Sequence, residues 1–204
     1  MKHFIMKLIF PAVTYMNAVL AAYIMLRYMI PRKKRYKDDW IFTGVCVGSI
    51  IWSLGFAALF LQTTVENAFW CRAVGMAGVF IYSIAAQIFA CHISPLGKIW
   101  KIVVVGFSML GIPLYFLMTR EGIVVFEPNV FGMSYHFNKG PVSNLYTIYT
   151  VVIALNILVI MLHIMLTAKV KRYVYFARTF LLLIFFMAVG LILDTIFPAM
   201  GLPA

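Results

Sequence analysis

The fold is decided by Phe69–Ile93, FWCRAVGMAGVFIYSIAAQIFACHI, a long run in which Arg72 carries the only formal charge. A helix needs about 20 predominantly apolar residues to cross a hydrocarbon core of roughly 30 Å. The run is continuously apolar and lacks the alternating pattern of a membrane β-barrel strand. We therefore predict a transmembrane helix at this position.

Five further apolar runs flank this one. They are Leu8–Met29, Trp40–Leu61, Ile102–Met118, Leu145–Ala168 and Thr179–Phe197. Over its 204 residues the chain is 64% hydrophobic and 11% charged, with a mean hydropathy of +0.99. Soluble domains are nearer half apolar and a quarter charged. The composition excludes a water-soluble globule and predicts an all-α integral membrane protein, one domain over residues 1–204, with a bundle of six transmembrane helices.

The basic residues predict the orientation of this bundle. Lys and Arg number 17 against six Asp and Glu, giving a net charge of +11. Most of them lie in three loops that alternate along the chain, Pro31–Asp39, Ser94–Lys101 and Thr167–Arg178. The positive-inside rule places these loops in the cytoplasm and both chain ends outside. The charge is thus explained by topology, with the lipid bilayer as partner and no nucleic acid.

One outer segment, Thr119–Asn144, is much longer than a simple connector. Within it IVVFE (Ile123–Glu127) and MSYHF (Met133–Phe137) are β-prone runs, separated by PNVFG. A Pro/Asn/Gly turn between two such runs is typical of a hairpin. Long loops in compact domains are usually functional or disordered. We predict a small extracellular β-hairpin that covers a ligand site in the outer half of the bundle.

Six residues are candidates for that ligand site. They are Arg72, Asp194, Trp70, Tyr146, Tyr149 and His136. Arg72 and Asp194 lie at matching depths in the third and sixth expected helices, so an interhelical ion pair is one hypothesis. The alternative is that Arg72 snorkels to lipid headgroups while Asp194 accepts hydrogen bonds from water.

The other four candidates also have two interpretations. Trp70, Tyr146 and Tyr149 form either a wall for a small apolar ligand or part of the aromatic belt at the membrane interface. His136 is either a pH-sensitive group or an ordinary surface residue of the hairpin.

Three amides, Asn17, Gln87 and Asn156, lie near the middle of their expected helices. A polar group in lipid usually forms a hydrogen bond with a neighbouring helix, although a ligand or gating role is the alternative. Small residues on the second and third expected helices, including a GxxxG at Gly44–Gly48, predict close packing against other helices of the bundle, with specific dimerisation as the alternative.

No pattern indicates catalysis. The sequence has no HExxH, no GxSxG, no paired intramembrane carboxylates and no glycine-rich phosphate loop. Cys46, Cys71 and Cys91 form no CxxC pair, and His92 with His163 lacks the further signals of a haem protein. We therefore predict no enzyme activity, no metal and no cofactor.

Three passages resemble the N-terminal seven-helix sensor region of bacterial histidine kinases and related diguanylate cyclases. They are NAFWCRAVGMAGVFIYSIAAQIFACHIS (Asn67–Ser94), FNKGPVSNLYTIYTVVIAL (Phe137–Leu155) and KVKRYVYFARTFLLLIFFMAVGLILDTIFPAMGLP (Lys169–Pro203). The resemblance implies a multi-pass protein of the bacterial cytoplasmic membrane that binds a small ligand. It also implies a seventh helix and a cytoplasmic output region that forms a homodimer, both of which would follow Ala204.

From these patterns we expect a membrane sensor, or input module, that transmits a helix rearrangement to an output domain. The main alternative is a small transporter or channel subunit of the cytoplasmic membrane. Gly111 and Pro113 interrupt the fourth expected helix, as in transporters built from inverted repeats, but the first helix has no matching interruption.

Overall fold

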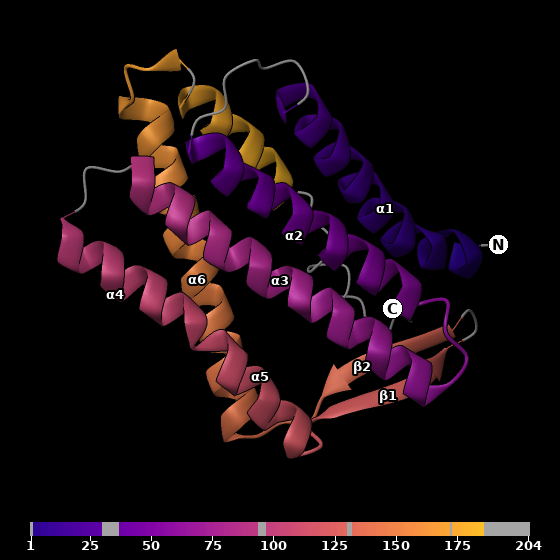
Figure 1. Ribbon diagram of the computed structural model, residues 1–204. Coiled ribbons are helices and arrows are strands. Elements are labelled where there is room, and N and C mark those ends of the chain that lie inside the picture. The colour runs from indigo at the N-terminus through magenta and orange to yellow at the C-terminus, as the bar shows by residue number, and fades with distance from the viewer. Residues whose placement is uncertain (1, 30–36, 94–96, 130–131, 172, 186–204) are drawn as a thin grey trace.

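The computed structural model describes residues 2–29, 37–93, 97–129, 132–171 and 173–185. They form a helical bundle with one β-hairpin at its end (Figure 1). The elements are α1 (Lys2–Met29), α2 (Lys37–Leu59), α3 (Val65–Ile93), α4 (Lys98–Met109), α5 (Gly111–Arg120), β1 (Val124–Asn129), β2 (Gly132–Phe137) and α6 (Pro141–Thr167). A shorter apolar helix, Tyr173–Phe185, follows α6.

Four helical segments of the described chain are long and apolar enough to cross a membrane. They are Asp39–Leu59, Val65–Ile93, Lys98–Arg120 and Pro141–Thr167. Large apolar side chains cover the outside of the bundle, as with Leu166, which is 79% exposed. Such a surface suits lipid, in which apolar side chains have no reason to be buried. The first and last expected spans correspond to α1 and to Tyr173–Phe185; the remainder of the last one lies outside the described residues.

The helices α2 and α3 form the closest pair. A Cβ atom added to Gly48 would lie 2.9 Å from the carbonyl oxygen of Gly78, and one added to Gly78 would lie 2.8 Å from that of Gly48. Gly55 likewise faces the backbone of Gly75. Small residues allow helix backbones to approach closely and gain van der Waals contact. The expected close packing is therefore present, and it joins α2 to α3.

The fourth expected span is two helices rather than one. Leu110 separates α4 from α5, and its N–H bonds the carbonyl of Phe107 in a tight turn. Proline has no N–H, so Pro113 cannot donate to the residue four positions earlier, as an α-helix requires. The interruption expected at Gly111 and Pro113 is therefore present as a break in an otherwise continuous span.

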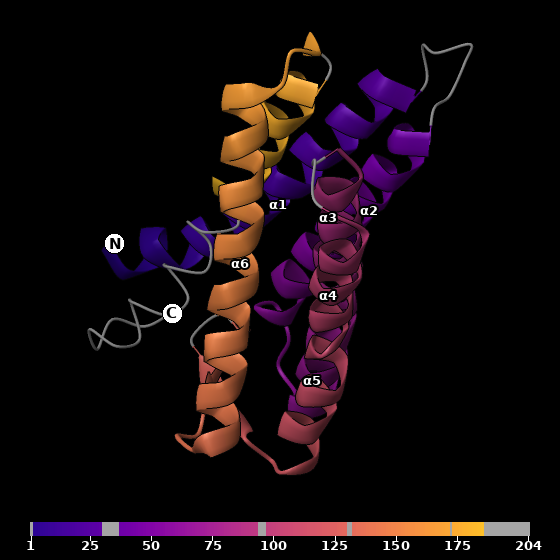
Figure 2. The same cartoon turned by 90° about the vertical axis from the view of Figure 1, so that its left-hand side faces the viewer.

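A second layer packs behind the α2–α3 pair. Figure 2 shows α6 standing apart from the row of α3, α4 and α5, with the last described helix between α6 and α1. Phe89 of α3 and Met161 of α6 are fully buried there, together with Phe176 and Phe180 of the last helix. The rings of Phe42 and Phe176 are in tilted contact, with centroids 4.6 Å apart, and this contact packs the last helix against α2.

Five helices begin before the expected apolar runs: α1 at Lys2, α2 at Lys37, α3 at Val65, α4 at Lys98 and α6 at Pro141. The third helix begins at Val65, not Phe69, and Glu66 in its first turn favours the positive end of the helix dipole. The fifth expected helix, which is α6, begins at Pro141, not Leu145, because proline suits the first turn of a helix.

Candidate functional site

The hairpin presents one aromatic face to the bundle. Phe126 of β1 pairs with Tyr135 of β2, and Val124 pairs with Phe137. Because side chains alternate along a strand, these four share one face. Met133 lies on the same face and is buried. The hairpin contacts the ends of α2 and α3, as seen at the lower right of Figure 1.

Arg72 of α3 lies under this face, inside a cage of three aromatic rings. Its guanidinium carbon is 5.0 Å from the ring centroid of Tyr135, 5.2 Å from that of Tyr115 and 5.6 Å from that of Phe137. A cation within about 6 Å of an aromatic face is attracted by the ring quadrupole, by about 2 kcal/mol or more when desolvated. We call Arg72, Tyr115, Tyr135 and Phe137 the arginine cage.

The cage encloses the cation almost completely. Arg72 is 2% exposed, and its Nε atom has no hydrogen-bond partner among the described residues. Counted from Val65, Arg72 lies about 10 Å along α3, deeper than its position after Phe69 suggests. This burial contradicts the snorkelling alternative, in which the charged head reaches the surface. Asp194, the expected partner, lies outside the described residues.

A pocket of about 630 Å³ opens beside the cage. Its lining comes from the first two turns of α3, the end of α5 and strand β1 (Val65, Glu66, Phe69, Arg72, Thr119, Val124 and Phe126). Arg72 is the only cationic side chain in that lining. The pocket therefore combines an apolar wall with one buried donor that lacks an acceptor.

Tyr146 and Tyr149 lie near the cage but do not line this pocket. The ring of Tyr146 contacts that of Phe137, with centroids 6.2 Å apart, and its hydroxyl is 3.9 Å from the sulfur of Met76. The Tyr149 hydroxyl donates to the carbonyl of Ser108, at 2.6 Å. Tyr146 thus supports the cage from behind, and Tyr149 holds α6 against the break between α4 and α5.

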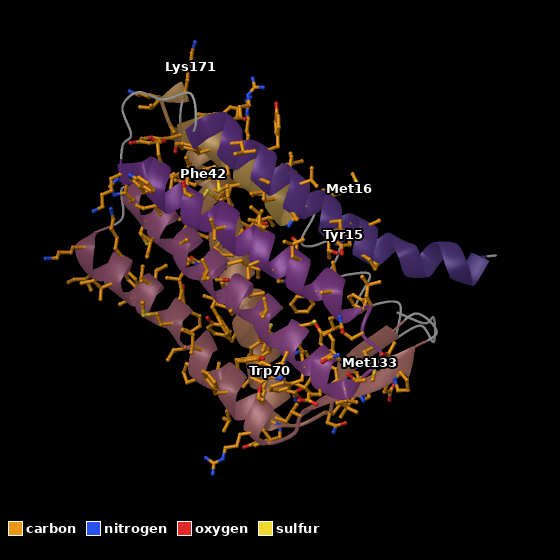
Figure 3. The ribbon with its side chains drawn as sticks, turned by 45° about the vertical axis from the view of Figure 1, so that its right-hand side comes forward. Tyr15, Met16, Phe42, Trp70, Met133 and Lys171 are labelled. Atoms are coloured by element: carbon orange, nitrogen blue, oxygen red, sulfur yellow. The ribbon has the colours of Figure 1, made fainter. Side chains whose placement is uncertain are left out.

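Trp70 and His136 are not brought to the cage. Trp70 is 61% exposed on the outside of α3, in edge contact with Phe69. Trp70 and Met133, both labelled in Figure 3, lie near the hairpin end of the bundle. This position of Trp70 suits the interfacial aromatic belt. His136 lies on the outer face of β2, 3.6 Å from the Glu127 carboxylate in a solvent-exposed pair.

The three mid-helix amides join neighbouring helices. Asn17 of α1 donates to the hydroxyls of Ser49 and Ser53 of α2, at 2.9 and 2.8 Å. Asn156 of α6 donates to the Gln87 side-chain oxygen of α3, at 2.9 Å. These bonds connect α1 with α2 and α3 with α6, where each is worth roughly 0.6–2 kcal/mol.

Gly111→Ala is expected to destabilise the protein by about 1–2 kcal/mol, the value of one broken hydrogen bond with some strain. The new Cβ would lie 2.7 Å from the Tyr149 hydroxyl, so that side chain must leave Ser108. Unfolding of the purified chain by SDS titration measures the change. Gly97→Ala is the control, since a Cβ there meets nothing within 4 Å. Equal stability of the two variants would contradict the expectation.

Arg72 is conspicuous in the sequence, whereas the three rings around it are not. Tyr135 and Phe137 alternate around the predicted polar position His136, so a period of two already placed them on one face of the strand. The sequence pattern does not say which element that face meets. Tyr115 gave no signal, because it lies among other apolar residues of the fourth span.

Comparison of the chain with protein families, with curated proteins and with solved structures finds no match. Within the described ranges, no group of three or more His, Cys, Asp or Glu side chains is placed to hold a metal ion. The function is therefore inferred from the chemistry of the arginine cage and its pocket.

Proposed function

We propose that this chain is the ligand-binding input module of a bacterial signalling protein, with the hairpin on the outer side of the cytoplasmic membrane. The observation that supports this proposal is Arg72: a buried cation with a free Nε donor, beside a pocket, at the end of the bundle that the hairpin covers. Burying a cation is costly unless it is paired. Retaining one at a pocket is typical of a functional site.

The rings of the cage come from two different parts of the fold. Tyr115 belongs to α5, whereas Tyr135 and Phe137 belong to the hairpin. A ligand shifts a conformational equilibrium only through different affinities for the two states. A ligand that contacts Arg72 changes how strongly this side chain holds the hairpin rings. The hairpin position, and with it the packing of α3 against α5, is then coupled to ligand binding.

The distribution of charge supports the proposed orientation. The exposed cations Lys98, Lys169 and Lys171 lie at the end of the bundle opposite the hairpin, as the position of Lys171 in Figure 3 shows. Cytoplasmic loops are enriched in Lys and Arg. The proposal places six crossings in the bilayer, with α1 and the helix that begins at Tyr173 as the first and last.

A small transporter is the second candidate, and the break between α4 and α5 favours it. Interrupted helices near a binding site are a feature of transporters. The two functions differ in access to the site: alternating access exposes a transporter's site to both sides of the membrane in turn. An input module needs access from the hairpin side alone.

Cysteine labelling at Phe69 separates the two. Phe69 lines the pocket and is partly buried. In a chain whose natural cysteines are replaced by alanine, Phe69→Cys is expected to react with an impermeant maleimide only from the hairpin side. Lys139→Cys and Lys171→Cys mark the two sides of the reconstituted membrane. Reaction of Phe69→Cys from the Lys171 side would contradict the input module and support the transporter.

A further inference from the structure

We propose that the pocket beside the arginine cage binds an amphiphilic monoanion: a single carboxylate or phosphodiester group on an apolar chain, with its oxygens at Arg72. The proposal rests on the proposed function and names the class of ligand that the same site binds. Three features of the site carry the inference: the free donor, the apolar lining and the balance of charge.

The unpaired Nε donor of Arg72 favours an oxyanion as the polar group of the ligand. The three rings of the cage attract the guanidinium charge but offer its N–H groups no oxygen acceptor along the ring faces. Arginine donors radiate in the guanidinium plane, and the fork geometry matches the two oxygens of a carboxylate or phosphate. The Nε of Arg72 is buried and unsatisfied, and Arg72 lines the pocket. An oxyanion in the pocket meets the guanidinium there and supplies the acceptors that the rings do not.

The other residues that line the pocket favour a ligand with an apolar chain. Val65, Phe69, Val124 and Phe126 form most of the wall. The Thr119 hydroxyl already donates to the carbonyl of Tyr115, at 2.9 Å, so it adds no donor for an anion. A volume of about 630 Å³ lies within the range of sites for small molecules. A hydrocarbon chain fills such a space without leaving polar groups unpaired.

The charge balance selects a single negative charge. Arg72 is the one cation of the lining, and Glu66 is an exposed acid of the same pocket. A dianion would retain one uncompensated charge beside the Glu66 carboxylate, which is unfavourable in a weakly screened site. A monoanion matches the single charge of Arg72, because the exposed Glu66 carboxylate is hydrated and does not require Arg72 as its partner.

Decanoate and decanol test the inference, because they share the chain and differ in the charged group. Binding is measured by equilibrium dialysis with the full chain in nanodiscs of neutral phosphatidylcholine, with empty nanodiscs as the blank. We expect the wild-type protein to bind decanoate about tenfold or more tighter than decanol, the value of a charge-assisted hydrogen bond. Arg72→Met keeps an unbranched side chain but removes the guanidinium, and it is expected to abolish this preference.

Arg120→Met is the matched control, since it removes an exposed cation one residue from Thr119 that does not line the pocket. Its preference for decanoate is expected to equal that of the wild type. Arg72→Lys keeps the charge but loses the Nε donor and the fork. It is expected to show an intermediate preference, which keeps the test valid if Arg72→Met fails to fold.

Equal binding of decanoate and decanol by the wild type, or a preference that survives in both Arg72 variants, would overturn the inference. Nanodiscs doped with phosphatidylglycerol identify the source of the anion. Competition with decanoate supports a membrane lipid as the ligand, and undiminished decanoate binding supports a free acid. The labelling of Phe69→Cys is independent of these results, so one-sided access without decanoate binding would remove the ligand class and leave the input module in place.

Discussion

The substitution Gly78→Ala is expected to lower the free energy of unfolding by about 3 kcal/mol, at the upper end of the usual cost of overpacking. A Cβ at Gly78 would overlap the backbone nitrogen of Trp52 and lie 2.7 Å from its Cα and 2.8 Å from the carbonyl oxygen of Gly48. Backbone atoms of a packed helix cannot turn away as a flexible side chain does. The α2–α3 pair must therefore separate along its length to admit a single methyl group.

Gly106→Ala provides the control for this effect. Gly106 lies within α4, and a Cβ there meets nothing within 4 Å. Alanine is a better helix former than glycine by about 1 kcal/mol, so this variant is expected to be as stable as the wild type or slightly more so. SDS titration of both variants in the same detergent measures the difference. A Gly78→Ala protein as stable as Gly106→Ala would show that α2 and α3 are not packed at this contact.

Much of this fold could be predicted from the sequence because lipid imposes simple requirements. Backbone groups in hydrocarbon must bond within their own segment, so length and hydropathy identify the helices. The hairpin was also predictable: the expected runs Ile123–Glu127 and Met133–Phe137 correspond to β1 and β2. Helix ends were less predictable, since hydropathy marks the apolar run and not the polar turn that precedes it, as at Val65.

The site was only partly predictable, for a different reason. A charge within an apolar run, such as Arg72, is conspicuous in any sequence. Its surroundings depend on tertiary contacts between segments far apart in the chain, here α3, α5 and β2. Trp70 is the opposite case: it is a candidate from the sequence, but it lies away from the cage. A residue two positions from Arg72 points to the opposite side of the helix.

Gly132→Ala is expected to release the hairpin from the bundle and expose Arg72. Gly132 has φ +150°, a conformation that residues with a Cβ rarely adopt. A Cβ there would also overlap the carbonyl oxygen of Phe60 and lie 2.9 Å from that of Gln62. Strain and overlap together disfavour the seated hairpin by about 3 kcal/mol. Hydrogen exchange of the hairpin amides measures the release, and their protection is expected to fall about a hundredfold.

The hairpin and the arginine cage are one structural unit, and this makes the Gly132 variant informative about the site. Tyr135 and Phe137 supply two of the three rings around Arg72, so their departure removes both contacts together. Gly140→Ala is the control in the same loop, because its φ of −175° suits any residue and a Cβ meets nothing within 4 Å. If Gly132→Ala loses hairpin protection while amides of α3 around Arg72 keep theirs, the hairpin opens as a separate element. Loss of protection in both regions at once would show that the hairpin cannot move without unfolding the bundle, and would contradict its role as the part that responds to ligand.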